Sequence, residues 1–521
     1  MQKQPGFWIL LVTLSASLLG VRAGAISTAE GTPVARSAHR AQAPSSSTGE
    51  YVARASDCMS CHTGAADKPF AGGYPVKSPL GIIYGPNITP DADTGIGNWT
   101  QADFERALRK GVRKDGAYLY PAMPYMNYTK MSAADMDALW KYIHGLKPIR
   151  NEVPKNTLPF PFSVRSGLAL WQDLYFKPGP FVPVAAKGED WNRGAYLVEA
   201  LGHCDACHTP RNMALAPKTK EHLEGGEIQG WYAPNINGGD YSHVARWDTN
   251  QFVTYLKTGN APDNAKVIGP MEEVIHDSLQ YLSPGDLRAI AVYLKDQPSE
   301  QNPQAPTKAY LPRVEQGKLV YENNCSSCHQ SNGQGIKGTV PALAGNGAVT
   351  ALQPYDVIMA VLEGFPANGS WGAMASFANN LSDDQISDVA NYVRTAWNNN
   401  ASPNATPASV GDWRKNATAA PVNAKSMLCP DLEKDVLEPA LKDDPASLEQ
   451  AAREPSHMSA LVSAYKSARP RSSKAEVIEG LSTAYCRVLA SQPISEARMN
   501  AQLADFAQSA ATRLVGNAKG D

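Results

Sequence analysis

One five-residue pattern, Cys-x-x-Cys-His, occurs three times and carries the most specific chemistry of the chain. The copies are Cys58-Met-Ser-Cys61-His62, Cys204-Asp-Ala-Cys207-His208 and Cys325-Ser-Ser-Cys328-His329. Two thiols at this spacing form thioethers with the vinyl groups of a porphyrin, and the adjacent imidazole ligates the iron. A zinc or redox Cys-x-x-Cys pair needs no following histidine. Three copies that all end in His therefore predict three covalently bound haem c groups.

A sixth iron ligand is expected downstream of each motif. A thioether sulfur is the usual choice in electron-transfer sites, because it favours ferrous iron and raises the potential. The candidates are Met123 in Tyr-Pro-Ala-Met-Pro, Met271 in Gly-Pro-Met and Met374 in Trp-Gly-Ala-Met. Any methionine can instead fill an apolar gap. The competitors by position are Met126 and Met131 for the first iron and Met359 for the third.

Each motif lies between two predicted helices. The first helix begins near Gly49, Gly194 or Gly317, and the closing helix follows a capping serine, which is Ser132, Ser283 or Ser382. Apolar stripes at helical spacing follow each serine, and a tyrosine falls ten residues after it, at Tyr142, Tyr293 and Tyr392. This arrangement is similar to the small class I cytochrome c fold. The predicted fold class is mostly α, with three class I cytochrome c domains in tandem plus a C-terminal helical domain.

The first two repeats are closer to each other than to the third. Met271 follows Met123 by 148 positions, and the same offset separates Asn87 from Asn235 and Trp99 from Trp247. The two tryptophans are expected either to pack on the macrocycle or to be plain core residues. The pattern indicates a duplication with a more distant third module.

Composition divides the rest of the chain. Lys3, the apolar run Phe7–Gly20 and Ala23-Gly-Ala25 are typical of a cleaved export signal, with an uncleaved anchor as the alternative. The predicted segments are a signal peptide at 1–25, a flexible linker at 26–48, cytochrome domain 1 at 49–147, a proline- and aromatic-rich strap at 148–185 packed between domains, cytochrome domain 2 at 186–297, a linker at 298–312, cytochrome domain 3 at 313–397, a linker at 398–425 and a helical C-terminal domain at 426–521.

Two of the eight cysteines lie outside the motifs, at Cys429 and Cys486. An oxidising compartment favours a disulfide between them. The C-terminal segment that contains them has one amphipathic stretch at Lys474–Ala490, with Val477, Leu481, Tyr485 and Val488 on its apolar side.

The net charge of −2 offers no support for nucleic-acid binding. The chain also lacks a dinucleotide fingerprint, a catalytic triad and a metal-hydrolase motif, so no catalytic residue is predicted. Irons with His and Met ligands leave no open position for a substrate.

The residues quoted above resemble the triheme cytochrome c subunit of bacterial membrane-bound periplasmic dehydrogenases, whose members accompany gluconate, sorbitol, fructose, alcohol and aldehyde dehydrogenases. The resemblance spans residues 49 to about 400. Its most specific segments are Gly85-Pro-Asn-Ile-Thr-Pro-Asp91, Leu119-Tyr-Pro-Ala-Met-Pro-Tyr125 and Gly202-His-Cys-Asp-Ala-Cys-His-Thr-Pro-Arg211. It implies the axial pairs His62/Met123, His208/Met271 and His329/Met374. Residues 426–521 depart from the family pattern.

The resemblance implies an electron-transfer subunit that is not an enzyme by itself. Its partner would be a dehydrogenase catalytic subunit, with a flavin type favoured and a pyrroloquinoline-quinone or molybdenum type as alternatives. The substrate would be an alcohol, sugar, sugar acid or aldehyde, and the acceptor ubiquinone or a terminal cytochrome. The expected location is the periplasm, peripherally attached to the outer face of the cytoplasmic membrane. A free-standing multihaem carrier and a haem peroxidase are the other hypotheses.

Overall fold

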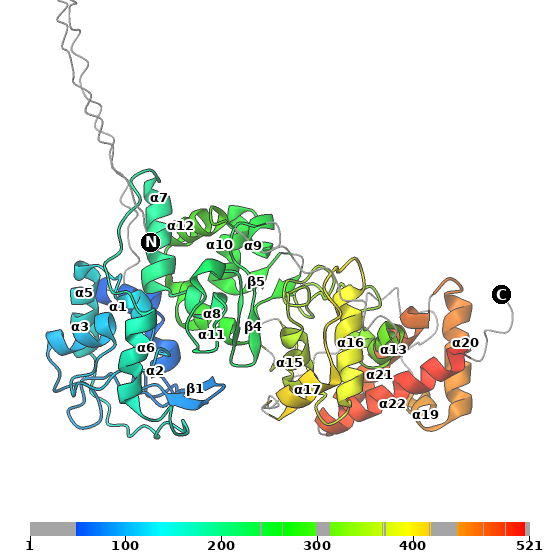
Figure 1. Ribbon diagram of the computed structural model, residues 1–521. Helices are drawn as coiled ribbons and strands as arrows, with labels where there is room; N and C mark the ends of the chain where they lie inside the picture. Colours follow the sequence, from blue (N-terminus) through cyan, green and yellow to red (C-terminus); the bar gives the residue numbers. More distant parts are fainter. Residues whose placement is uncertain are drawn as a thin grey trace, which may run out of the picture. The chain divides into compact units, whose positions relative to one another are not determined.

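The computed structural model describes residues 48–239, 242–262, 264–298, 313–366, 368, 371–415, 417, 445–472, 474–494 and 496–515 (Figure 1). Within these ranges helices dominate, and the strands form three short antiparallel hairpins. The predicted mostly α fold class is confirmed. The predicted signal peptide and nearly all of the linkers 26–48 and 298–312 lie outside the described residues, as does Cys429.

The first module contains two long helices that frame a loop-rich centre. Its elements are α1 (Thr48–Ala55), α2 (Cys58–His62), β1 (Pro75–Ser78), β2 (Gly81–Tyr84), α3 (Gln101–Lys110), α4 (Tyr125–Tyr128) and α5 (Ala133–His144). In the hairpin, Val76 pairs with Ile83. Thr100 caps α3 with a complete capping box, and Gly111 ends that helix in the left-handed conformation.

The second module repeats this order with additional short elements. These are α7 (Glu189–Tyr196), the π-helical turn η2 (Leu197–Leu201), α8 (Asp205–His208), η3 (Thr219–Glu221), β3 (Gly226–Ile228), β4 (Trp231–Ala233), α9 (His243–Arg246), α10 (Thr249–Thr258), β5 (Asn260–Ala261), β6 (Ala265–Lys266), α11 (Pro270–Asp277), η4 (Leu279–Tyr281) and α12 (Pro284–Lys295). The two hairpins of this module pair β3 with β4 and β5 with β6.

The third module extends beyond its predicted end. It contains α13 (Val314–Asn324), α14 (Ser326–His329), α15 (Tyr355–Glu363), α16 (Asp383–Thr395) and α17 (Pro407–Arg414). The last helix lies in the segment predicted as a linker, yet Ala405 and Val410 are fully buried in the core of this module. These buried apolar residues join α17 to the core of the third module, although the segment around them is polar.

A glycine at the start of each module lets its first and last helices cross closely. A Cβ atom on Gly49 would lie 2.3 Å from the Ala138 carbonyl oxygen, and one on Gly194 would lie 1.9 Å from the Ala289 oxygen. On Gly317 it would lie 2.0 Å from the Asp388 oxygen. The shared tyrosines contact the same crossings, since the Cβ atoms of Tyr142, Tyr293 and Tyr392 are the other close neighbours of these glycines. The shared glycines and tyrosines therefore have a packing function.

The strap at 148–185 contains η1 (Arg165–Gly167) and α6 (Leu168–Tyr175). It contacts both modules that flank it: the Phe176 ring lies 5.1 Å from the Tyr125 ring, and the Trp171 indole donates to the Ala214 carbonyl at 2.8 Å. Its outer side nevertheless differs from the prediction of a packed strap, because large apolar side chains are exposed there. These are Phe160, Phe162, Val164, Leu170, Leu174, Val182 and Val184.

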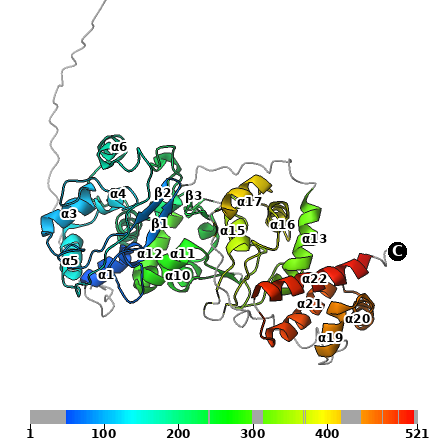
Figure 2. The same cartoon turned by 90° about the horizontal axis from the view of Figure 1, so that it is seen from below.

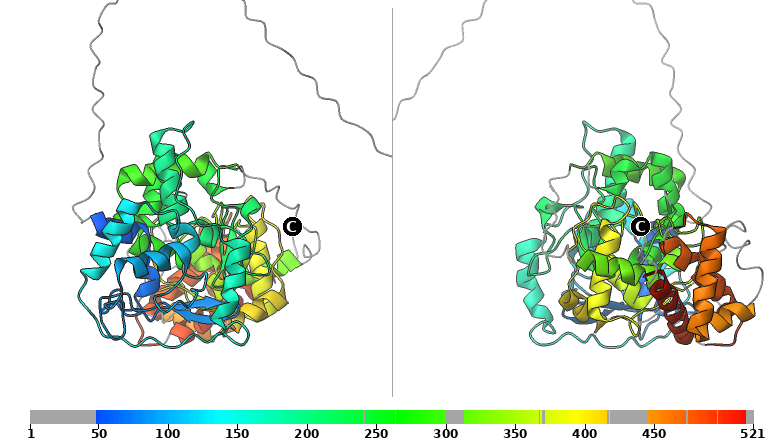
Figure 3. Two further views of the ribbon diagram at one scale, coloured as in Figure 1. Left: turned by 60° about the vertical axis from the view of Figure 1, so that its left-hand side comes forward. Right: turned by 90° about the vertical axis from the view of Figure 1, so that its right-hand side faces the viewer.

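The C-terminal helices, drawn in orange and red in Figure 3, have a hydrophobic core of their own. They are α19 (Pro445–Arg453), α20 (Pro455–Ala468), α21 (Lys474–Ala490) and α22 (Glu496–Val515). The amphipathic stretch predicted at Lys474–Ala490 is α21, and Val477, Leu481 and Tyr485 are buried in it as expected. Cys486 is buried and disulfide-bonded; its pairing with Cys429 stays a prediction. No helix in the described ranges is long and apolar enough to cross a membrane.

Candidate haem sites

The three motif histidines share one hydrogen bond that orients the ring. The Nδ1 atom of His62 donates to the Pro86 carbonyl at 2.7 Å, and that of His208 to the Pro234 carbonyl at 2.7 Å. In the third motif, His329 Nδ1 donates to the Pro341 carbonyl at 3.0 Å. A metal-bound imidazole usually donates its second nitrogen in this way, which sets the tautomer and leaves Nε2 for the metal. The donor arrangement therefore fits haem iron at each motif.

Burial shifts the pKa values of the motif histidines and cysteines. It lowers the pKa of His62, His208 and His329, so each imidazole is neutral near pH 7 and has a free lone pair. Burial also raises the pKa of the Cys58 and Cys325 thiols to about 12. The six motif cysteines are half-buried and not disulfide-bonded, so their thiols are available for thioether bonds.

The predicted methionine ligands lie beside the same cores as the motifs they would complete. Met123 and Met271 are half-buried against the core that also packs against Cys58 and Cys204, and Met374 lies beside the core that contacts Cys325. Two competitors have gap-filling positions instead: Met131 is 1% exposed and Met359 is 3% exposed. The methionine ligands themselves stay predictions.

A hollow of about 400 Å³ lies beside the first module, and Trp99, Arg113, Lys114 and Asp115 line it. Arg113 pairs with Asp115 at 3.2 Å, and Lys114 donates to the Asn98 carbonyl, so both cations already have partners. The equivalent Trp247 packs 5.0 Å from the Tyr255 ring, and its carbonyl accepts a hydrogen bond from Lys295. The first tryptophan thus borders a polar hollow, whereas the second is part of an aromatic cluster.

The first two modules pack through reciprocal tyrosine contacts. Tyr51 of α1 donates to Asp286 and accepts from the Ser283 backbone at the start of α12. Tyr196 of α7 makes the same pair of bonds with Asp135 and with the Ser132 backbone at the start of α5. Each tyrosine therefore binds the helix cap of the other module, which is the pattern of a two-fold related interface.

This packing brings the first two attachment motifs together. Asn127 in the first module donates to Asp205 of the second motif at 2.6 Å. Arg54, just before the first motif, donates to the Asp277 carbonyl of α11 at 3.1 Å. Ser60 inside the first motif also donates to the Asp277 carboxylate of α11 at 3.4 Å. The helix α4, which follows Met123, thus touches the second motif, and α11, which carries Met271, touches the first.

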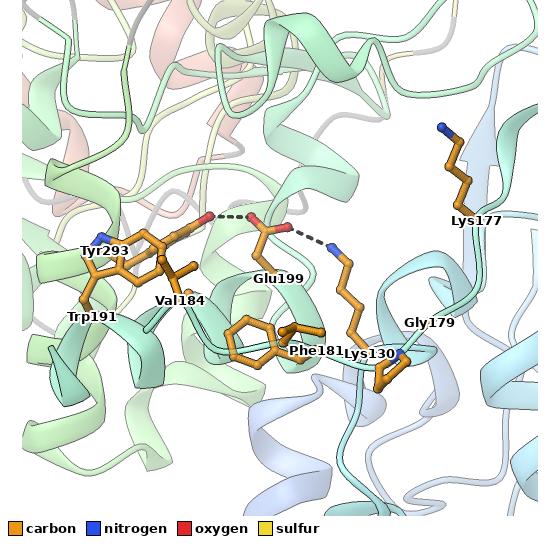
Figure 4. Close-up of a pocket in the computed structure, with 11 residues that line it drawn as sticks. Lys130, Lys177, Gly179, Phe181, Val184, Trp191, Glu199 and Tyr293 are labelled. Carbon is orange, nitrogen blue, oxygen red and sulfur yellow. Dashed lines mark hydrogen bonds and ion pairs between the residues drawn. The ribbon is translucent and has the colours of Figure 1, made fainter. Parts of the chain in front are cut away.

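A mostly buried carboxylate completes the interface (Figure 4). Glu199 in η2 pairs with Lys130 of the first module at 2.9 Å and with His222 at 2.7 Å, and it accepts from the Tyr293 hydroxyl at 2.9 Å. Burial alone would raise the pKa of this carboxyl, but the hydrogen bond from His222 and the charge of Lys130 lower it to about 2. Glu199 is therefore ionised and joins the two modules.

The second and third modules meet through different elements. Trp371, three residues before Met374, donates its indole N–H to Asn260 at 2.9 Å. The Tyr232 backbone in β4 donates to the buried Asp356 of α15 at 2.7 Å, and burial raises the pKa of that carboxyl to about 7. The second module thus contacts the first near its attachment motif and the third near the segment that bears Met374.

Sequence reasoning did not identify the proline carbonyls, the reciprocal tyrosines or Glu199. The prolines have a signal, because Pro86 and Pro234 begin the Pro-Asn-Ile segments shared by the first two repeats. Tyr51 and Tyr196 also occupy equivalent places in their helices. His222 lies in no attachment motif, and it has a structural role as the partner of Glu199.

Comparison with known proteins gives a consistent picture. The cytochrome c family model matches residues 46–147 and 314–397. The fructose dehydrogenase cytochrome subunit of Gluconobacter japonicus is 40% identical, over 70% of this chain and 82% of that protein. The alcohol dehydrogenase (quinone) cytochrome c subunit of Gluconobacter oxydans (strain 621H) is 39% identical, over 72% and 83%. The gluconate 2-dehydrogenase cytochrome c subunit of Pantoea cypripedii is 38% identical, over 71% and 89%.

The match to this chain covers most of the length of each relative. The cytochrome c family binds haem c covalently through the Cys-x-x-Cys-His motif that this chain repeats. The oriented histidines and the motif thiols, which form no disulfide, fit that cofactor. The chain therefore belongs to the cytochrome c family, in the group that contains these dehydrogenase cytochrome c subunits.

Proposed function

We propose that the chain is a three-haem electron-transfer subunit of a dehydrogenase complex. The observation that carries this proposal is the threefold repetition of one site: a Cys-x-x-Cys-His motif whose histidine donates Nδ1–H to a proline carbonyl. Haem bound at such a site supplies one-electron redox chemistry. The protein orients each imidazole, keeps it neutral and packs each of the first two motifs against the other module.

The partner is a dehydrogenase catalytic subunit in the periplasm, with a flavin type favoured and a pyrroloquinoline-quinone or molybdenum type as alternatives. The acceptor is ubiquinone or a terminal cytochrome, and the protein is attached to the outer face of the cytoplasmic membrane. The names of the relatives, which are subunits of fructose, alcohol and gluconate dehydrogenases, support the catalytic partner.

The exposed strap supports a subunit over a free-standing carrier. Leu170 and Leu174 of α6 are 65% and 64% exposed, and such clusters of exposed apolar side chains mark interaction surfaces. The strap is also joined to the segment that leads to Met123, beside the first haem site. Arg165 donates to the Tyr118 carbonyl at 2.8 Å, and the Tyr120 hydroxyl donates to the Phe162 carbonyl at 3.0 Å. A partner on the strap would therefore lie beside the segment that bears Met123.

Copurification and haem counting test the proposal together. The intact mass of the exported protein should equal the chain cleaved after Ala25 plus three haems. Leu170→Asp together with Leu174→Asp should keep all three haems but lose the catalytic subunit during purification, since both side chains are exposed and their loss leaves the core intact. The matched control is Val292→Asp in α12, because Val292 is apolar and 41% exposed outside the strap. Two haems, or full copurification of the double variant, would contradict the proposal.

A further inference from the structure

The third attachment motif is covered by a different partner from the first two. The first and second modules cover each other's motif, as the bonds from Asn127 to Asp205 and from Ser60 to Asp277 show. In the third module, α14 carries the motif and packs against α21 of the C-terminal domain. Figures 1 and 2 show α13, which leads into this motif, beside α22.

The contact is close and involves small polar side chains. Thr483 in α21 is fully buried and donates its hydroxyl to the Ser327 carbonyl inside the motif at 3.1 Å. Asn323, two residues before the motif, donates to Gln508 of α22. Ser326 is also fully buried. Small side chains on both elements let α21 lie directly on the motif backbone.

The covering domain has its own core and carries no attachment motif in its described residues. Its core includes Met458, Ile478 and Phe506, and it is separate from the core of the third module. The described residues of the domain therefore provide burial without a haem attachment motif. This distinguishes it from the first two modules, in which the cover of each motif is another haem site.

We infer that the C-terminal helical domain is an intramolecular cover of the third attachment motif, which keeps water away from that edge of the site and holds its potential high. The cysteines of the motif bind the porphyrin at its edge, so the backbone over the motif marks a place where that edge approaches the surface. Ferric haem carries one more positive charge than ferrous haem, and a dry surrounding disfavours the more charged form. Covering the motif therefore raises the potential of the third site.

The test is Thr483→Arg in the full-length haem protein. The larger charged side chain cannot remain in the fully buried position, so α21 must leave the motif. We expect amide hydrogen exchange in residues 320–330 to become at least about tenfold faster, as expected when a closed contact becomes an open one. Redox titration should show one of the three midpoint potentials lowered and the other two unchanged. The matched control is Ser459→Arg on the exposed side of α20, which should change neither quantity.

The inference rests on the third motif binding haem, and the haem count of the parent protein checks that separately. Unchanged amide exchange in Thr483→Arg would show that α21 does not cover the motif. Faster exchange with three unchanged potentials would show that the cover does not control the potential. If Thr483→Arg loses the third haem, Gln508→Arg provides the decision: Gln508 is exposed, so this variant removes only the Asn323 contact. It should shift both quantities in the same directions by less, and no shift would overturn the inference.

Discussion

Replacing Glu199 by glutamine tests how the first two modules are held together. The Glu199 side chain is 15% exposed and faces Lys130, His222 and Tyr293. Its pKa falls from the ordinary 4.5 to about 2, because His222 and Lys130 outweigh the effect of burial. This difference corresponds to about 3 kcal/mol of folding stability at about 1.4 kcal/mol per pKa unit. Glutamine keeps one acceptor oxygen, which can replace Oε1 toward Tyr293 or Oε2 toward Lys130 but not both, so we expect a loss of about 2 kcal/mol.

The stability difference between parent and Glu199→Gln should depend on pH. The Glu199 contribution is present above pH 4.5 and is lost as the pH falls through about 2. Burial lowers the pKa of His222, but the bond and charge of Glu199 raise it above 6.5, so its contribution is present below pH 6.5 and is lost as the pH rises through the raised value. The difference should therefore be largest between pH 4.5 and 6.5, and the Lys130 pair should retain part of it at higher pH.

Calorimetry of the haem-loaded protein measures this difference. A loss of about 2 kcal/mol should lower the unfolding midpoint of the unit formed by the first two modules by roughly 4–8 °C at pH 6. The control is Glu152→Gln, because Glu152 is 83% exposed and its distance to Arg150 is 4.0 Å, so the midpoint should barely change. The assigned role of Glu199 would be refuted if the stability difference between parent and Glu199→Gln were equal at pH 6 and pH 3. It would also be refuted if that difference were below about 0.5 kcal/mol at pH 6.

Two further predictions concern the iron ligands and the disulfide. Met374→Leu should keep all three covalent haems but remove one thioether ligand and lower one midpoint potential, as measured by redox titration; an unchanged third site would instead favour Met359. Thiol titration of the exported, haem-loaded protein under denaturing conditions should detect no free thiol, because six cysteines are in thioethers and Cys429 is predicted to pair with Cys486. Two free thiols would refute that pairing.

Local sequence was sufficient to predict the elements whose chemistry depends on short spacing. Ser132, Ser283 and Ser382 each cap a closing helix by accepting from the backbone N–H three residues later. Among these three serine caps, only the cap at Ser382 forms a complete capping box. Asp135 and Asp286, at the corresponding third positions of the other two caps, instead accept from the tyrosines of the neighbouring module. The cap is a local property, whereas the partner of its carboxylate depends on how the modules pack.

The amino-acid sequence by itself determined the three attachment motifs and the framing helices, because these depend on residues within a few turns of one another. Only the tertiary structure decided which carbonyl orients each histidine, since Pro86 is 24 residues from His62. It also decided that two motifs face each other while the third lies under α21, since Thr483 and Ser327 are 156 residues apart. Such contacts depend on the packing of separate cores, and no local periodicity or spacing predicts which surfaces will meet.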